Sequence, residues 1–221
     1  TAFTGSHRYI LDYFVEEVLS KQPSEVQEFL RYTSILERLC GPLCDAVTGN
    51  KDGQVMLEQI ERANLFLTPL DDERRWYRYH GLLWDMLRVN LERSDPELLK
   101  ALHRRASAWF EQEHLDLEAA NHAMAAKDYA RVADIAERSG PRWWANASHA
   151  AVHLLLPPEV TAQRPTFCVS QGWGCTVRGQ LDQASHLYDA AERLLAAGGQ
   201  KYPDADAMMK FITLVRKYIA E

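Results

Sequence analysis

The segment from residue 64 to residue 80 constrains the fold most strongly, because it carries a hairpin pattern between stretches of helical sequence. Apolar and polar side chains alternate on both sides of a charged connector, Asp71-Asp72-Glu73. A period of two is typical of strands, and a short acidic connector is typical of a polar turn. A lone hairpin is marginally stable in water, so we expect this one to lean on neighbouring helices.

Helical periodicity surrounds the hairpin on both sides. The expected helices span residues 6–19, 25–39, 43–47 and 54–63 before it, and 82–91 after it. Ser24 is a good N-cap for the second of these, and glycine and proline interrupt the pattern at Gly41-Pro42. Three helices, a hairpin and a packing helix predict a winged-helix domain over residues 22–93. Residues 1–21 are then a helix that links to a domain upstream.

Beyond Ser94-Asp95-Pro96 the sequence becomes alanine-rich and helical. Pro96 suits the first turn of a helix that is capped by Ser94 or Asp95. Helices are expected over residues 97–112, 117–126 and 129–138. We interpret residues 94–140 as a helical arm.

Residues 165–195 follow the tetratricopeptide (TPR) pattern in a degenerate form. Its small, turn and aromatic positions are occupied by Gly172, Gly179, Ala184, Tyr188 and Ala191. A single repeat cannot bury its own face, so another helix is expected over 204–220. Residues 141–221 are therefore interpreted as the start of a TPR-like sensor region, with helix then loop over 143–158. The expected fold class is mainly α: a winged-helix module with one β-hairpin, followed by a helical-hairpin, TPR-like solenoid.

Composition and charge narrow the function classes. The 221 residues carry a net charge of −6, whereas a main nucleic-acid surface is normally basic. No apolar run approaches the roughly 20 residues that span a bilayer. The start of the chain has neither a methionine nor the pattern of a signal peptide. We expect a cytoplasmic internal fragment of a longer protein, with no membrane contact.

Metal-binding patterns are weak. The spacing of the cysteines completes no standard zinc site, which favours small apolar packing residues; they are Cys40, Cys44, Cys168 and Cys175. His149 and His153 lie one helical turn apart near Trp143-Trp144, but a third ligand is missing. Core packing or solvent exposure is favoured for them, and no metal is expected. The run His103-Arg104-Arg105 is interpreted as solvated surface.

Several segments resemble one bacterial family. They are the hairpin at 64–80 and the stretches 12–19, 33–49 and 102–110, which together cover most of residues 5–140. They resemble the winged-helix region of the large ATP-dependent LuxR-type transcription regulators of the MalT-like group. These are signal-transduction ATPases with numerous domains (STAND ATPases). Residues 165–195 are similar to the helical repeats that follow in that family.

The resemblance implies a place in the middle of a long layout: nucleotide-binding domain, winged helix, helical arm, repeat-built sensor and DNA-binding helix-turn-helix. The chain has no Gly-x-x-x-x-Gly-Lys-Ser/Thr phosphate loop, so no enzyme activity is expected from it alone. ATP or ADP is the expected cofactor of the full-length protein, and none is expected in this fragment. The implied partners are the protein's own nucleotide-binding and DNA-binding domains, an inducer (small molecule or protein) on the repeats, and a second copy in self-association.

His80 ends the hairpin and is the one candidate cofactor-binding residue. It matches the family histidine that contacts the ADP phosphates and locks the resting state. An imidazole can donate a hydrogen bond to a phosphate oxygen. Many relatives carry a second histidine next, where this chain has Gly81, which leaves a role for a pair open. The alternative is a histidine that merely closes the hairpin against the next helix.

The expected function is to relay effector binding and nucleotide state to a DNA-binding domain outside this chain. One alternative is a stand-alone winged-helix DNA binder, in which Arg74, Arg75 and Arg78 contact phosphates. The acidic connector beside them favours a solvated strand face instead. The other alternative is a TPR-like scaffold that binds a protein partner on its concave face.

Overall fold

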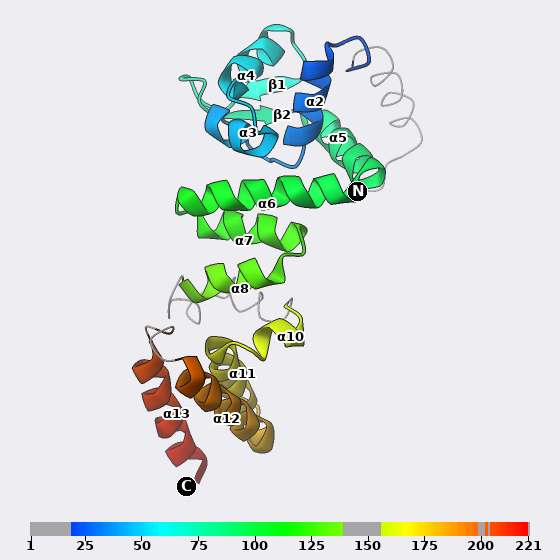
Figure 1. Cartoon of the computed structure of the whole chain (residues 1–221). Coiled ribbons are helices and arrows are strands. Elements are labelled where there is room, and N and C mark those ends of the chain that lie inside the picture. The colour runs from blue at the N-terminus through cyan, green and yellow to red at the C-terminus, as the bar shows by residue number, and fades with distance from the viewer. Residues whose placement is uncertain (1–18, 139–155, 199–201, 203, 221) are drawn as a thin grey trace. The chain divides into compact units, whose positions relative to one another are not determined.

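The computed structural model describes residues 19–138, 156–198, 202 and 204–220 (Figure 1). The chain divides into two compact units, Thr1–Asp128 and Tyr129–Glu221, which are described separately. The helix expected over 6–19 and the helix and loop expected over 143–158 lie outside the described residues except at their ends. The domain boundaries expected at residues 93 and 140 stay predictions.

The first unit combines helices with one small sheet, as expected. Its elements are α2 (Ser24–Thr33), α3 (Gly41–Thr48), α4 (Gly53–Arg62), β1 (Leu67–Pro69), β2 (Tyr77–Tyr79), α5 (Gly81–Ser94), α6 (Pro96–Gln112) and α7 (Asp116–Ala125). Within the described residues the sheet consists of β1 and β2 alone, paired antiparallel with Leu67 opposite Tyr79. Tyr77 and Tyr79 are almost fully buried, so the hairpin packs on the helical core.

The prediction that the second helix runs from 25 to 39 is wrong at its end. The helix α2 stops at Thr33, whose hydroxyl donates to the carbonyl of Phe29 at 2.6 Å and lies 2.7 Å from the Tyr79 hydroxyl. Because the Thr33 proton is used, Tyr79 is the donor in the second bond. Leu39 then exchanges two backbone hydrogen bonds with Tyr77, at 2.9 and 2.8 Å. The helix therefore ends before Leu39, and Leu39 forms an antiparallel β-bridge with Tyr77 of the hairpin.

Two further local expectations need correction. The N-cap of α2 is Pro23 rather than Ser24, and no side chain caps this helix. The strand expected from residue 65 begins only at Leu67, because Asn64 and Phe66 adopt positive φ angles of 51° and 57°. Left-handed backbone of this kind breaks an extended strand.

The carboxylate of Asp71 holds the connector of the hairpin. It accepts hydrogen bonds from the backbone N–H groups of Arg75 and Trp76, both at 2.9 Å. Replacing Asp71 by Ala removes both acceptors, so we expect the free energy of unfolding to fall by about 1 to 2 kcal/mol. Urea unfolding measures this loss. Asp72→Ala is the matched control, because Asp72 is exposed and bonds to no described residue; an equal loss in both variants would contradict the prediction.

The helices α6 and α7 form a close hairpin. The side chain of Asp95 accepts from the N–H of Leu98 at 3.0 Å, which identifies Asp95, not Ser94, as the cap of α6. Ser107 donates to the carbonyl of Ala119 at 2.8 Å across the pair. Small buried residues at this contact let the two backbones approach closely.

The second unit contains α8 (Tyr129–Arg138), α10 (Pro158–Thr161), α11 (Pro165–Val177), α12 (Leu181–Gly198) and α13 (Ala205–Ala220). Gly179 turns the chain between α11 and α12 with a φ of 74°. A Cβ on Gly172 would lie 2.7 Å from the ring of Tyr188, so only glycine permits this approach. Ala184, Tyr188 and Ala191 are fully buried. The expected helical hairpin and the following helix are confirmed, and the tetratricopeptide assignment itself stays a prediction.

The four cysteine side chains are buried and form no disulfide with one another. Burial raises the pKa of the Cys44 thiol well above its usual range. These side chains pack as small apolar residues, as expected. Within the described residues, no helix has the length and apolar character that crossing a bilayer requires.

Candidate functional site

His80 lies where β2 ends and α5 begins. Its N–H donates to the carbonyl of Phe66 at 2.7 Å, and its own carbonyl accepts from the N–H of Trp84 at 3.0 Å. The side chain is exposed, and its ring lies edge-on to Phe66 with the centroids 6.2 Å apart. The backbone of His80 thus closes the hairpin, while the imidazole remains accessible to an outside group.

The surroundings leave the imidazole of His80 available for a hydrogen bond. No described side chain bonds to its nitrogens. A Cβ on the next residue, Gly81, would meet nothing within 4 Å. The absence of a second side chain here is therefore not imposed by packing.

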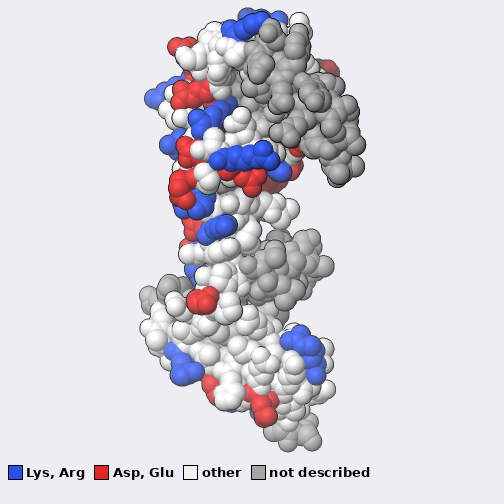
Figure 2. Space-filling view, turned by 90° about the vertical axis from the view of Figure 1, so that its right-hand side faces the viewer, with Lys and Arg blue, Asp and Glu red and all other residues white. Residues whose placement is uncertain are grey.

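The arginines of the hairpin are largely balanced by carboxylates. Arg74 pairs with Glu61 at 3.4 Å, and Arg75 pairs with Glu73. Arg78 is exposed on β2. Figure 2, which shows another face, has both basic and acidic side chains on the described part of the surface in view. In the hairpin itself, two of the three arginines, Arg74 and Arg75, pair with carboxylates. This pattern favours a solvated strand face over a nucleic-acid contact.

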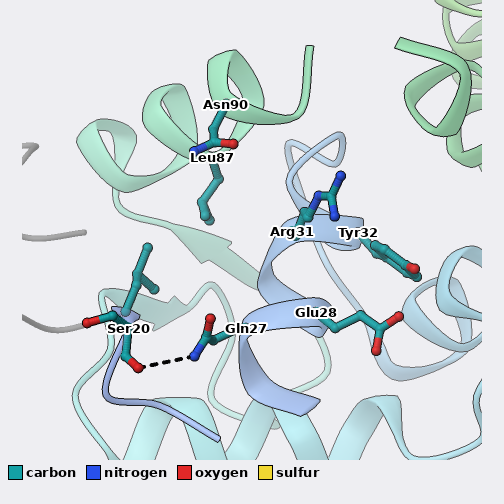
Figure 3. A pocket seen from close by; sticks show the side chains of 8 residues that line it. Ser20, Gln27, Glu28, Arg31, Tyr32, Leu87 and Asn90 are labelled. Carbon is teal, nitrogen blue, oxygen red and sulfur yellow. Dashed lines mark hydrogen bonds between the residues drawn. The ribbon is translucent and has the colours of Figure 1, made fainter. Parts of the chain in front are cut away.

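A first pocket, of about 400 Å³, lies between α2 and α5 (Figure 3). The side-chain amide of Gln27 donates to the carbonyls of Ser20 at 3.3 Å and Gln22 at 2.8 Å. Arg31, at the other end of the pocket, pairs with Asp95 at 3.7 Å. Since Gln27 and Arg31 already have partners within the protein, the pocket offers few free donors to a ligand.

A second pocket, of about 610 Å³, is built within the first unit and was not anticipated from the sequence. We call it the tryptophan–arginine pocket. Its lining comes from the segment after α2, from the residue before β2, and from α5, α6 and α7. Its polar and aromatic members are Glu37, Arg38, Trp76, Trp84, Arg88, His103, Phe110, Glu118, Asn121 and His122. Some of these residues share a segment, such as Trp84 and Arg88 one turn apart on α5, but the lining as a whole comes from separate segments of the chain, so no local signal predicts that they form one pocket.

Each arginine of this pocket lies over a tryptophan. The guanidinium carbon of Arg38 is 5.1 Å from the ring centroid of Trp76, and that of Arg88 is 4.9 Å from the ring centroid of Trp84. Both distances are within the range of cation–π attraction. The two cations are therefore oriented before any ligand arrives.

Two histidines that line the same pocket, His103 and His122, contact each other. Their Nδ1 atoms are 2.8 Å apart, so one ring donates and the other accepts. The pKa of His103 is lowered to about 4, mainly by desolvation on burial and to a smaller extent by the positive charge of Arg88. Desolvation and the neighbouring His103 lower the pKa of His122 to about 4. The expectation that 103–105 is solvated surface is wrong for His103, whereas Arg104 and Arg105 are exposed.

The other candidates from the sequence cannot be placed in the described part of the structure. His149, His153 and Trp143-Trp144 lie outside the described residues. Over the described ranges, no group of three His, Cys, Asp or Glu side chains gathers in a way that would hold a metal ion.

Comparison with known proteins places the hairpin in a recognised module. Residues 15–99 match the family model of the MalT winged helix domain. The chain is 35% identical over 173 residues to the serine/threonine-protein kinase PknK of Mycobacterium tuberculosis, covering 77% of this chain and 16% of the kinase. It is 32% identical over 199 residues to the HTH-type transcriptional regulator MalT of Klebsiella pneumoniae, covering 87% of this chain and 21% of that regulator. For MalT of Vibrio cholerae the identity is 30% over 201 residues, 89% of this chain and 21% of the regulator.

Proposed function

The chain belongs to the MalT-like proteins through its winged helix domain, and on this premise we propose that it is the relay segment of a multidomain transcription regulator. In the whole protein it joins a nucleotide-binding domain to a sensor built of helical repeats and a DNA-binding domain. The chain spans 21% of the length of the MalT relatives, so these other domains belong to the proposal.

The kinship with two kinds of protein supports a relay role. One relative is named as a kinase and another as a transcriptional regulator, although both share this segment. A segment that occurs both in a kinase and in a transcriptional regulator suits a role in transmitting a signal, with phosphorylation and DNA binding carried out by other domains. Fold alone does not imply function, so the proposal depends on a specific residue.

The accessible imidazole of His80 is the observation that carries the proposal. Two backbone hydrogen bonds fix its position at the start of α5, and no described side chain occupies its nitrogens. In the resting state His80 donates a hydrogen bond to a phosphate oxygen of ADP that the nucleotide-binding domain holds. Binding of inducer and ATP releases this contact and allows self-association.

Replacing His80 by Ala in the intact protein tests the relay. A hydrogen bond to a charged group contributes about 1.5 to 3 kcal/mol, so we expect ADP to dissociate roughly 10- to 100-fold faster. Basal transcriptional activity should rise because the resting state is weakened. Stopped-flow release of a fluorescent ADP analogue and a reporter assay without inducer measure the two effects.

Thr68→Ala is the matched control for this experiment, since Thr68 is an exposed residue of the same hairpin with no assigned role. It should leave both readouts at the wild-type level. Wild-type ADP retention together with wild-type basal activity in His80→Ala would refute the role of His80.

A further inference from the structure

The tryptophan–arginine pocket carries two arginines, Arg38 and Arg88, that form no direct ion pair with a carboxylate of the described residues. Other arginines of the described chain do pair with carboxylates; they are Arg31, Arg62, Arg74, Arg75, Arg164 and Arg216. A guanidinium that is already stacked on an indole loses little freedom when it binds an anion. The pair is thus suited to receive one.

The apolar part of the lining favours an occupant with a flat apolar body. Ile35, Leu36 and Phe110 are buried and line the pocket, and the ring of Phe110 stacks on that of His122 at 5.3 Å. The volume of about 610 Å³ suits a small organic molecule. Aromatic walls with a few polar groups are typical of small-molecule sites.

The charges at the pocket limit the charge of its occupant. Glu37 and Glu118 also line it, so two carboxylates accompany the two arginines. Burial keeps His103 and His122 neutral at pH 7. A dianion or trianion would meet repulsion from the carboxylates, whereas a single negative charge can sit at the arginines.

We propose that the tryptophan–arginine pocket binds a small organic monoanion, a carboxylate joined to a flat aromatic body. The carboxylate is held by Arg38 and Arg88, the two guanidinium groups that lie over tryptophan rings. The ring lies against Phe110 and the apolar lining. Because the pocket is lined by both the winged helix and the α6–α7 hairpin, its occupant links these two parts of the first unit.

Binding of 1-naphthylacetate to the 221-residue chain tests the proposal, with uncharged 1-naphthylacetamide as the shape-matched comparison. We expect titration calorimetry to show at least tenfold tighter binding of the acid. Arg38→Met and Arg88→Met should each weaken the acid at least tenfold and leave the amide unchanged. Arg104→Met, an exposed arginine of α6 outside the pocket, is the control and should bind as wild type does.

Thermal melts of all variants report that they are folded. Equal affinity for acid and amide, no binding of the acid, or wild-type affinity in the arginine variants would overturn the proposal. His80→Ala should leave naphthylacetate binding unchanged, so failure of the relay and failure of this site are distinguishable.

Discussion

Replacing Tyr188 by Ala is expected to lower the free energy of unfolding of the second unit by about 3 to 5 kcal/mol, the usual range for loss of a large buried aromatic side chain. The side chain of Tyr188 is completely buried between α11 and α12. Its ring fills the space that Gly172 leaves open. Removing it would leave a cavity that the close helix pair cannot collapse into without bending.

The hydroxyl of Tyr188 adds a smaller contribution. Thr176 donates its proton to the carbonyl of Gly172 at 2.9 Å, so Tyr188 is the donor to the Thr176 oxygen at 3.1 Å. Tyr188→Phe removes only this bond and should cost about 1 kcal/mol. The difference between the two variants separates packing from hydrogen bonding.

Native-state hydrogen exchange of the α11 and α12 amides measures both losses without assuming that the two units unfold together. Tyr218→Ala is the matched control, because Tyr218 is 74% exposed on α13 and should change stability by less than about 0.5 kcal/mol. A loss below about 1 kcal/mol in Tyr188→Ala would show that the helix pair does not depend on this contact.

The helical hairpin around Tyr188 was predictable because its signals are local. Glycine at the turn and small residues at helical spacing stand close together in the sequence. The hairpin at 64–80 was predictable for the same reason, since its alternation and its acidic turn occupy one short segment. Asp95 was likewise one of two expected caps for α6.

The end of α2 was not predictable in this way. The helical periodicity continues to Leu39, but Leu39 is withdrawn from the helix by its backbone bridge to Tyr77. Because Tyr77 is distant in sequence, the helix propensity of the segment that ends at Leu39 does not reveal this pairing. Tertiary pairing overrides local preference here.

The tryptophan–arginine pocket was missed for a related reason. Arg38, Trp84 and His122 belong to separate segments that only the packing of α5, α6 and α7 brings together. His103 stands beside two arginines in sequence, which made a solvated surface the natural interpretation. The accessible side chain of His80 follows directly from its place at the end of a strand, so its environment was easier to anticipate.

Acidification from pH 7.5 to pH 5 is expected to destabilise the first unit through the His103–His122 pair. Both pKa values are lowered from 6.5 to about 4, so between these values the unfolded chain binds more protons than the folded chain. Unfolding then takes up protons, and stability falls as the pH falls. Two independent, fully buried shifts would give a loss of roughly 4 kcal/mol at pH 5.

We expect about half of that loss, near 2 kcal/mol, because both rings are partly exposed and because they titrate as a coupled pair. Protonating either ring to the imidazolium makes both of its nitrogens donors, so a doubly protonated pair cannot keep the Nδ1–Nδ1 hydrogen bond of 2.8 Å. The positive charge of Arg88 also opposes protonation of His103. The loss is complete only below the folded pKa, but most of it falls above the range in which ordinary carboxylates titrate.

Urea unfolding at several pH values between 7.5 and 5 measures how the free energy of unfolding depends on pH. Hydrogen exchange of the α6 and α7 amides follows the unfolding of the first unit. The double variant His103→Gln/His122→Gln places neutral amides at both positions and should flatten the slope, even if its stability at pH 7.5 is lower. His186→Gln, an exposed histidine of α12, is the control and should keep the wild-type slope. An unchanged slope in the double variant would assign the acid sensitivity to other groups. A flattened slope would show that a neutral histidine pair in the lining of the tryptophan–arginine pocket stabilises the first unit.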